Sequence, residues 1–333
     1  MRVLTDNYGR VHDYLRISLT DRCNLNCIYC NPVYAKAKYF DKEEILSFEN
    51  ILRLIEIFAS ELNFKKFRFT GGEPLARKGI DRFFCTLYNL KRKYKFTTAI
   101  TTNGTLLFEM LPDLKKYEVD DINISLDSLK PDKYKSITGK DNFNSVIEAI
   151  YKAKRLGYDN LKVNCVVMKG INDSEILDFI DFAVKENISV RFIEYMPFSN
   201  NGWNSDKFIS YKDIRNMILE NYDLVNASVN RGSVAKDYYI KHHAGMVSFI
   251  SSISDHFCNS CSRLRLTARG NLRLCLFFSK SNELDLRSML NNNIEDKNIS
   301  AAITEFLILK PKEHPAIEEL VKLDLNYMLT NGG

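Results

Sequence analysis

Hydrophobic positions along the first two thirds of the chain alternate between two kinds of pattern. Short runs rich in Ile, Val, Phe and Thr, which predict buried parallel strands, occupy residues 14–20, 65–70, 96–101, 121–126, 161–168 and 189–196. Between the strands, apolar residues recur at helical spacing, most clearly in 45–62, 146–156 and 176–183. Six strand–helix units with short connections predict a parallel sheet with right-handed crossovers.

Six units are two fewer than a closed eight-fold barrel contains. We therefore expect an α/β fold in which residues 1–200 form an open, partial (β/α)6 barrel of the TIM type. A doubly wound sheet is the alternative, and the pattern alone hardly separates the two. After Pro197 the pattern changes, and residues 201–333 are expected to form a C-terminal region. It should contain a helix at 211–222, short strands at 234–240 and 246–251, a second cysteine group and a Gly-Gly tail.

Three cysteines, Cys23, Cys27 and Cys30, directly follow the first predicted strand. Three thiolates on one short loop can each bind one iron of a [4Fe–4S] cluster, which normally has four cysteine ligands. Because no fourth cysteine is near in sequence, one iron would keep an open site for a substrate or cofactor. Zinc is the alternative, but zinc sites usually pair two Cys-x2-Cys units, which this spacing fits poorly.

A second group of three cysteines, Cys258, Cys261 and Cys275, lies in the C-terminal region. A zinc site completed by His256 is the main alternative to a cluster here. Arg263 and Arg265 follow Cys261 two residues apart, so on an extended segment both side chains point the same way. Arginines can bind phosphate or base edges through two hydrogen bonds, although a solvated basic surface is the plainer interpretation.

Composition narrows the partners and the compartment. The net charge of +5 permits an anionic small molecule and does not argue for nucleic acid. No run approaches the length of a membrane helix, and residues 1–10 lack the apolar segment of a signal peptide. We therefore expect a cytoplasmic protein with no membrane contact. Because thiols stay reduced there, the eight cysteines indicate metal binding or catalysis rather than disulfides.

The first cysteine loop, with Tyr29 just before the last cysteine, resembles the radical S-adenosylmethionine (SAM) superfamily. The resemblance implies a partial barrel, a [4Fe–4S] cluster whose open iron chelates the methionine part of SAM, and cleavage of SAM to a 5′-deoxyadenosyl radical. Residues 71–74, Gly-Gly-Glu-Pro, follow the second predicted strand. They resemble the superfamily's motif for the methionine amino group, although a tight β–α turn is the plainer interpretation. The cofactor-binding residues implied by the resemblance are Tyr29, Gly72, Glu73, Ser125 and Met196.

The whole chain resembles, more narrowly, the GTP 3′,8-cyclase family, lyases that carry out the first step of molybdenum cofactor biosynthesis. Two three-cysteine sites, the Arg-Leu-Arg stretch at 263–265 and the terminal Gly332-Gly333 are specific in combination. Other segments that carry the resemblance are 13–16, 68–74, 101–104, 125–129, 162–164 and 191–197.

This narrower resemblance implies two [4Fe–4S] clusters, with SAM as cofactor and GTP as substrate. Hydrogen is removed from the ribose 3′ carbon, which then attacks carbon 8 of guanine to give (8S)-3′,8-cyclo-7,8-dihydroguanosine 5′-triphosphate. The implied GTP contacts are Arg16, Arg68, Thr101, Lys162, Arg263, Leu264 and Arg265. The second cluster is implied to touch the guanine, and catalytic roles fall to Arg263, Arg265, Gly332 and Gly333, with the tail threading into the active site.

The implied partners are an electron donor and the next pathway enzyme, cyclic pyranopterin monophosphate synthase; a homodimer is left open. Two rival functions remain at this point. One is a radical SAM enzyme that modifies a peptide, although such proteins usually carry more cysteines after the barrel. The other is a zinc-stabilised binding module without catalysis.

Overall fold

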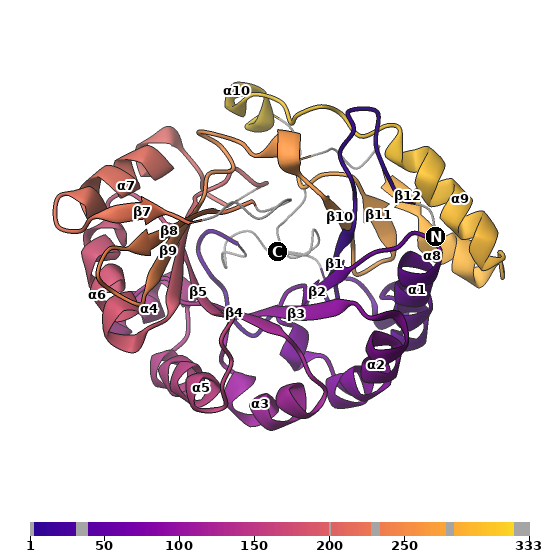
Figure 1. Ribbon diagram of the computed structural model, residues 1–333, viewed down its shortest axis with the longest axis horizontal. Helices are drawn as coiled ribbons and strands as arrows, with labels where there is room; N and C mark the ends of the chain where they lie inside the picture. The colour runs from indigo at the N-terminus through magenta and orange to yellow at the C-terminus, as the bar shows by residue number, and fades with distance from the viewer. Residues whose placement is uncertain (1–2, 31–38, 200, 228–233, 278–282, 323–333) are drawn as a thin grey trace.

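The computed structural model describes residues 3–30, 39–199, 201–227, 234–277 and 283–322. A single twelve-stranded sheet runs in the order β12-β11-β10-β1-β2-β3-β4-β5-β6-β9-β8-β7. It curves into an incomplete ring with helices outside it (Figure 1). The strands are β1 (Tyr14–Ser18), β2 (Lys66–Thr70), β3 (Thr97–Thr102), β4 (Asp121–Ser125), β5 (Leu161–Val167), β6 (Ser189–Glu194), β7 (Leu224–Asn226), β8 (Lys236–Ile240), β9 (Met246–Ile250), β10 (Arg263–Leu266), β11 (Asn271–Arg273) and β12 (Glu283–Asp285).

The six predicted strands are confirmed as β1 to β6, and each pairs in parallel with the next. This consecutive order confirms the partial barrel and excludes the doubly wound alternative, whose strand order reverses within the sheet. The sheet continues past six strands, because β9 adds in parallel to β6 and β10 adds in parallel to β1. Thus β10, β1 to β6 and β9 make eight parallel strands, two of them supplied by the C-terminal region.

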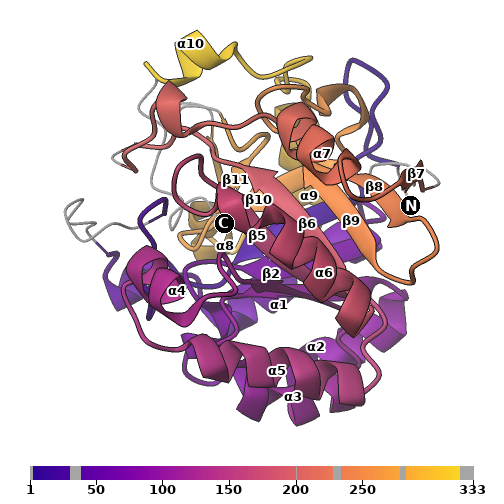
Figure 2. The same cartoon turned by 90° about the vertical axis from the view of Figure 1, so that its left-hand side faces the viewer.

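Most of the helices cover the outer face of the sheet, whereas α10 lies at the opening of the ring (Figures 1 and 2). They are α1 (Phe48–Ser60), α2 (Ile80–Tyr94), α3 (Leu107–Lys116), α4 (Pro131–Thr138), α5 (Phe143–Arg155), α6 (Ile176–Glu186), α7 (Tyr211–Leu219), α8 (Leu286–Asn291), α9 (Asp296–Leu307) and α10 (Ile317–Leu320). Helix α1 begins after Ser47, whose hydroxyl accepts a hydrogen bond from the amide of Asn50. Leu54 and Phe58 on its inner face are fully buried. None of the helices in the described ranges is long and apolar enough to cross a membrane.

Strand alternation separates the apolar core from a polar interior. On β1, Leu15 and Ile17 are fully buried in the hydrophobic core, so Tyr14, Arg16 and Ser18 point to the other face, into the ring. Phe67 and Phe69 on β2, with Ile122 and Ile124 on β4, are likewise fully buried in this core. The sequence therefore builds the core between sheet and helices and keeps polar side chains for the centre of the barrel.

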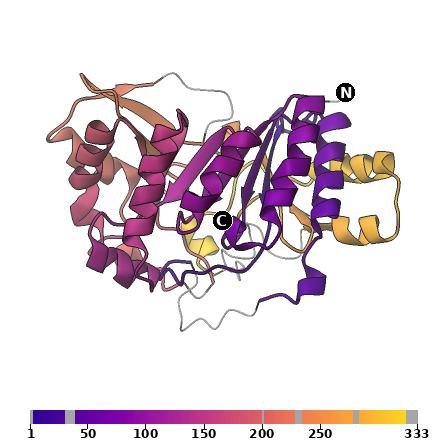
Figure 3. The same cartoon turned by 90° about the horizontal axis from the view of Figure 1, so that it is seen from below.

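The chain after β12 packs back onto the N-terminal half. Helix α9 lies beside α1 (Figure 3), where Arg53 and Asp296 form an ion pair of 2.7 Å. The segment after α9 is held by Arg10, whose guanidinium donates to the carbonyls of Pro311 and Lys312. The C-terminal segment is thus joined to the residues just before β1.

Candidate active site inside the barrel

The first cysteine loop leaves the carboxyl end of β1 and lies against the turn after β2. The amide of Gly72 donates to the Thr20 carbonyl, at 2.7 Å, and that of Glu73 to the Arg22 carbonyl, at 2.8 Å. A Cβ atom on Gly72 would lie 2.2 Å from the carbonyl oxygen of Arg22. Sequence reasoning connected the two glycines with a ligand, but the structure shows backbone packed directly against Gly72. A side chain at Gly72 would push the cysteine loop away.

Glu73 lies between the ends of β2 and β3 and is fully buried. Its carboxylate accepts hydrogen bonds from the hydroxyl of Thr102 and the amide of Asn103, both at 2.7 Å. Burial raises the pKa of Glu73 to about 7, despite these hydrogen bonds. The side-chain amide nitrogen of Asn103 lies 3.7 Å from the sulfur of Cys23. Glu73 and Asn103 therefore fix the first cysteine and put a carboxyl group beside it.

Tyr29 fastens the other end of the loop. Its hydroxyl donates to Asp127 at 2.7 Å, and the amide of Val166 donates to the same carboxylate at 2.9 Å. Burial raises the pKa of Asp127 to about 6. Sequence reasoning assigned no role to Asp127, although it lies within segment 125–129. The sequence did hold a signal for Asp127, because it follows β4, and active-site residues of such barrels lie at the carboxyl ends of the strands.

The three thiols of the first loop are close enough to affect one another. Burial, then the charge of Cys23 and of Asp127, raises the pKa of Cys30 to about 12. Burial is also the main cause of the raised pKa of Cys27. Across the described residues, no three His, Cys, Asp or Glu side chains meet closely enough to hold a single metal ion.

The second cysteine loop precedes β10. Cys258 and Cys261 come before the strand, and Cys275 follows β11, which runs antiparallel to it, so all three lie at one end. Burial raises the pKa of Cys261, but Lys310 and Arg263 outweigh that effect and lower its pKa to about 7. The ammonium nitrogen of Lys310 lies 3.8 Å from the Cys261 sulfur.

His256 was the residue that would have completed a zinc site in the second loop. Its Nε2 atom lies 3.5 Å from a carboxylate oxygen of Glu313, and its ring lies against that of His314. The contacts that the structure records for His256 are therefore with Glu313 and His314.

The two cysteine loops lie at opposite ends of the barrel. Strands β1 and β10 are parallel, Cys23 follows the end of β1, and Cys261 precedes the start of β10. The four steps along β1, at about 3.3 Å each, alone separate the two loops by about 13 Å. Between them, Arg16 is paired in register with Arg265 on one side and Arg68 on the other. A row of arginines therefore crosses the interior between the two loops.

The cations in the interior are crowded and poorly solvated. Burial, with the charges of Arg263, Arg68 and Arg191, lowers the pKa of Arg16 to about 10. Burial and then Arg191 lower the pKa of Lys162 to about 8. Among the residues that the structure describes, the buried Nε groups of Arg16 and Arg191 have no hydrogen-bond partner. A polyanion bound here would satisfy these groups and relieve their mutual repulsion.

The pKa of Tyr14 is affected by the same positive charges. Burial by itself raises the pKa of Tyr14, but the charges of Arg68, Arg16 and Arg263 outweigh it and lower the pKa to about 8. The hydroxyl accepts a hydrogen bond from the Nε of Arg68 at 2.8 Å. Sequence reasoning missed Tyr14 and Arg191 as site residues. The signal was available, because strand alternation puts both on the interior face.

The remaining residues predicted to bind the cofactor or GTP lie in different parts of the structure. Thr101 accepts a hydrogen bond from Arg68 at 3.2 Å, and Ser125 ends β4. Met196 packs against a small apolar cluster that contains Phe198 and Phe277. The side chain of Leu264 is fully buried in the main core. Only the backbone of Leu264 is therefore available for its implied contact with GTP. Gly332 and Gly333 lie outside the described residues.

The arginines implied to contact GTP lie on strands, and two of them lie far from a strand end. Arg16 and Arg68 each occupy the third of five positions in their strands. Arg263 and Arg265 lie on β10 itself, facing the same side as predicted. The cations therefore form the wall of the barrel rather than its rim.

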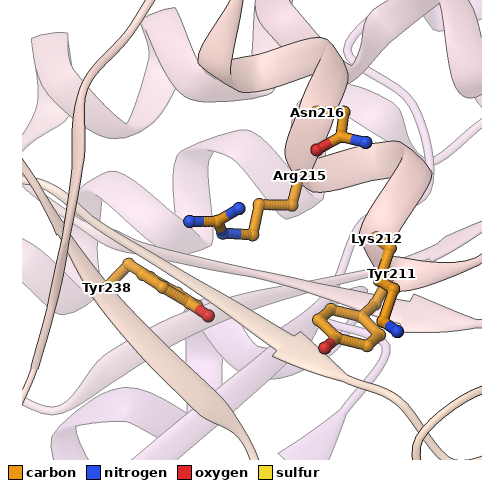
Figure 4. A pocket seen from close by; sticks show the side chains of 5 residues that line it. All are labelled: Tyr211, Lys212, Arg215, Asn216 and Tyr238. Carbon is orange, nitrogen blue, oxygen red and sulfur yellow. The ribbon is translucent and has the colours of Figure 1, made fainter.

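A surface pocket of about 260 Å³ lies apart from this interior, between α7 and β8 (Figure 4). It is lined by Tyr211, Lys212, Arg215, Asn216 and Tyr238. The guanidinium of Arg215 lies 5.4 Å from the ring centre of Tyr238. None of the predicted site residues lines this pocket, so it is separate from the candidate active site.

The fold and the two cysteine loops agree with two family models. Residues 17–183 match the radical SAM superfamily, and residues 188–316 match Molybdenum Cofactor Synthesis C. The fold is similar to that of Streptococcus suis SuiB bound to S-adenosylmethionine, with a TM-score of 0.64, 14% identity, and coverage of 96% of this chain and 77% of that one. This likeness supports the fold alone. Together these matches define a radical SAM protein.

Relatives of higher identity define the family more narrowly. The mitochondrial GTP 3′,8-cyclase of Arabidopsis thaliana is 40% identical over 99% of this chain and 84% of its own length. The GTP 3′,8-cyclase of Petrotoga mobilis is 38% identical over 93% of this chain and 94% of its own length. Molybdenum cofactor biosynthesis protein 1 of Bos taurus is 43% identical, and the chain spans about half of that relative's length, 48%. The chain belongs to the GTP 3′,8-cyclase family, and membership of the superfamily implies SAM and one [4Fe–4S] cluster.

Proposed function

We propose that this chain converts GTP to (8S)-3′,8-cyclo-7,8-dihydroguanosine 5′-triphosphate, the first step of molybdenum cofactor biosynthesis. The observation that carries the proposal is the set of buried cations between the two cysteine loops. Within the described part of the chain, the Nε groups of Arg16 and Arg191 find no hydrogen-bond partner. A triphosphate is a compact polyanion, and arginine binds it through paired, charge-assisted hydrogen bonds. The names of the relatives favour this substrate over a peptide.

The first cluster is assigned to Cys23, Cys27 and Cys30, and a second [4Fe–4S] cluster to Cys258, Cys261 and Cys275. With SAM bound, the first cluster supplies a 5′-deoxyadenosyl radical. In this proposal Gly72, Glu73, Ser125 and Met196 surround SAM. Glu73 is suited to the methionine ammonium because its carboxyl is already buried and oriented by Thr102 and Asn103. Tyr29, held by Asp127, keeps the cysteine loop in place.

The interior side chains act by positioning. Arg16, Arg68 and Lys162 hold the triphosphate together with Arg263 and Arg265, and Thr101 orients Arg68 through its hydroxyl. Leu264 contributes its backbone. Anchoring the phosphates on rigid strands fixes the ribose relative to the first loop and the guanine relative to the second. Holding reacting atoms in one geometry in this way lowers the barrier to an intramolecular attack.

Several further parts of the proposal rest on family resemblance. Gly332-Gly333 are proposed to enter the active site and, with Arg263 and Arg265, to act on the reacting nucleotide. An electron donor supplies the first cluster, and cyclic pyranopterin monophosphate synthase takes the product. We place the reaction in the cytoplasm, without nucleic acid or membrane as partner, and homodimer formation is left to measurement.

The decisive experiment analyses the reaction products of the unmodified chain and of two single variants, each with one arginine replaced by alanine. The anaerobically reconstituted chain, given SAM, GTP and a reductant, is expected to form 5′-deoxyadenosine and the cyclised nucleotide, both detected by mass spectrometry. Arg265→Ala should lose the nucleotide product. Arg269→Ala is the matched control, because Arg269 is half-exposed and pairs with Glu44 outside the interior. Cleavage of SAM without any cyclised nucleotide in the unmodified chain would reject the proposal.

A further inference from the structure

Lys310 is a buried lysine that neither the family motifs nor the proposed chemistry uses. It follows α9, and only 4% of its surface is exposed. Its ammonium group donates to the carbonyl of Arg263 at 2.8 Å and lies 3.8 Å from the sulfur of Cys261. A buried ammonium that contacts a thiol ligand and the strand carrying two substrate arginines calls for a functional explanation.

The surroundings hold Lys310 in this position. The guanidinium of Arg10 donates to the carbonyls of Pro311 and Lys312 just beyond it, and also to the carbonyl of Cys258 in the second cysteine loop. Arg10 is fixed in turn by Asp6, at 2.6 Å. The segment that carries Lys310 is therefore tied to the same loop that its side chain contacts.

Other charges near Lys310 do not cancel its own. The ring of His12 bonds to Asp6 at 3.0 Å. Burial, and then the charge of Lys310, lower the pKa of His12 to about 4, so this ring stays neutral at physiological pH. The negative charge of Asp6 is already shared with Arg10. Burial, with Arg10 and Arg263, lowers the pKa of Lys310, and the charges that favour its ammonium form are those of the Cys261 and Cys275 thiolates.

We propose that Lys310 is a positioning residue of the second cluster, whose positive charge sets the cluster's reduction potential and fixes Cys261 relative to Arg263. This inference rests on the second cluster of the proposed function. Hydrogen bonds and charges around the sulfurs of an iron–sulfur cluster tune its potential. A cation held beside a thiolate stabilises the state with one more electron, so it makes reduction easier.

The test uses the full chain with Cys23, Cys27 and Cys30 replaced by Ala, so that any cluster signal comes from the second site. Into this parent we introduce Lys310→Met, Lys310→Arg and Lys312→Met. Lys312 is the matched control, since it lies two residues away and is exposed. Each protein is reconstituted anaerobically, analysed for iron and sulfide, and titrated with a reductant while electron paramagnetic resonance follows the reduced cluster.

Lys310→Met is expected to shift the one-electron equilibrium at least tenfold towards the oxidised cluster, which is about 59 mV more negative. Lys310→Arg should shift it far less, and Lys312→Met should leave it unchanged. A potential for Lys310→Met equal to that of Lys312→Met would overturn the assignment.

Cluster content separates the remaining outcomes. A parent without iron and sulfide contradicts the second cluster itself, and so the proposed function, before any lysine is changed. Loss of the cluster in Lys310→Met, with cluster and potential kept in Lys310→Arg, supports a role for the charge. Loss of the cluster in both variants overturns that role, because it shows that shape rather than charge at position 310 is required.

Discussion

The two cysteine loops have the same number of thiols but opposite electrostatic surroundings. The first loop lies beside the buried carboxyls of Glu73 and Asp127. The second lies beside Lys310 and Arg263, with Arg10 bonded to its backbone. The barrel thus has a carboxyl-rich end and a cation-rich end, joined by an interior wall of arginines.

These surroundings shift the pKa values of Cys30 and Cys261 in opposite directions. Burial and the neighbouring negative groups raise the pKa of Cys30 to about 12, whereas the cations outweigh burial and lower the pKa of Cys261 to about 7. Only the thiolate binds metal, so iron binding must displace a proton more often at the first loop than at Cys261. Cys261 is therefore closer to its metal-binding protonation state before any metal arrives, whereas burial raises the pKa of Cys258 in the same loop.

The same difference matches the charges of the two proposed small molecules. SAM carries a sulfonium and an ammonium group, which suit the end with Glu73 and Asp127. GTP carries a triphosphate, which suits the cations that extend from the second loop along β10, β1 and β2. Opposite charges at the two ends would also discourage each molecule from binding in the other's place, because like charges repel in a poorly solvated interior.

The largest expected effect comes from removing the thiols of one loop at a time. Two [4Fe–4S] clusters predict about 8 irons per chain. Replacing Cys23, Cys27 and Cys30 by Ala should leave about half of this iron and abolish SAM cleavage. Replacing Cys258, Cys261 and Cys275 should also leave about half, with some SAM cleavage kept and no cyclised nucleotide. Iron and sulfide analysis beside 5′-deoxyadenosine assays measures both, and full iron in either variant would falsify the assignment.

A smaller effect is expected from the cations nearest the second loop. Arg263→Ala or Arg265→Ala should weaken GTP binding by about 1.5–3 kcal/mol, the scale of a hydrogen bond to a charged group. Iron content should stay unchanged. Calorimetric titration of GTP into each variant measures the effect, with Arg269→Ala as control. Unchanged affinity in both variants would show that the cation-rich end does not hold the triphosphate.

Strand alternation and cysteine spacing predicted most of the fold and the metal ligands. The six parallel strands followed from their β-branched and aromatic runs, because buried strands need such residues on the helix-facing side. The spacing of Cys23, Cys27 and Cys30 implied a loop at the end of the first strand. Strands β10 and β9, which flank β1 to β6 in the sheet, were not predicted to belong to the barrel. Pairing between segments distant in sequence leaves no local pattern.

The residues around the ligands were less predictable. Lys310 lies 49 positions from Cys261, and no periodic or spacing rule links the two. Asp127 is 98 positions from Tyr29. Such contacts follow from the curvature of the sheet and from the return of the C-terminal segment to Arg10. Arg16 was predicted, but its place in the centre of β1 rather than at a strand end required the register of the sheet.

The carboxyl-rich end gives a sharper test of the comparison. Glu73→Gln keeps the shape of the side chain and its bond to Thr102 but removes the negative charge. It should weaken SAM binding by about 1.5 kcal/mol, because a charge-assisted hydrogen bond becomes a neutral one, and leave GTP affinity unchanged. Calorimetry with each ligand on the reconstituted protein measures this.

Glu175→Gln is the matched control for Glu73→Gln. Glu175 is also fully buried, but it bonds to Ser128 and Leu129 away from the cysteine loops. This change should lower the free energy of unfolding and leave SAM affinity as it was. If Glu73→Gln weakened GTP binding as much as SAM binding, the electrostatic division between the two ends would be wrong.

The smallest expected effect is a pH dependence of GTP affinity that arises in the barrel wall. Burial and Arg191 hold the pKa of Lys162 at about 8 in the free protein, and a bound triphosphate would raise it by favouring the charged form. A group whose pKa rises on binding contributes fully below its free pKa, and its contribution declines as the pH increases from the free pKa to the higher pKa of the complex. GTP affinity should therefore fall about twofold between pH 7 and pH 8, and further above.

Two variants assign that pH dependence to its source. Lys162→Arg keeps a charge that does not titrate in this range, so its GTP affinity should change less between pH 7 and pH 8. Tyr14→Phe removes the other group with a pKa of about 8, whose ionisation would also repel phosphate. Calorimetric titration of GTP at both pH values compares each variant with the unmodified chain. A fall that persists undiminished in Lys162→Arg and in Tyr14→Phe would mean that neither wall residue faces the triphosphate.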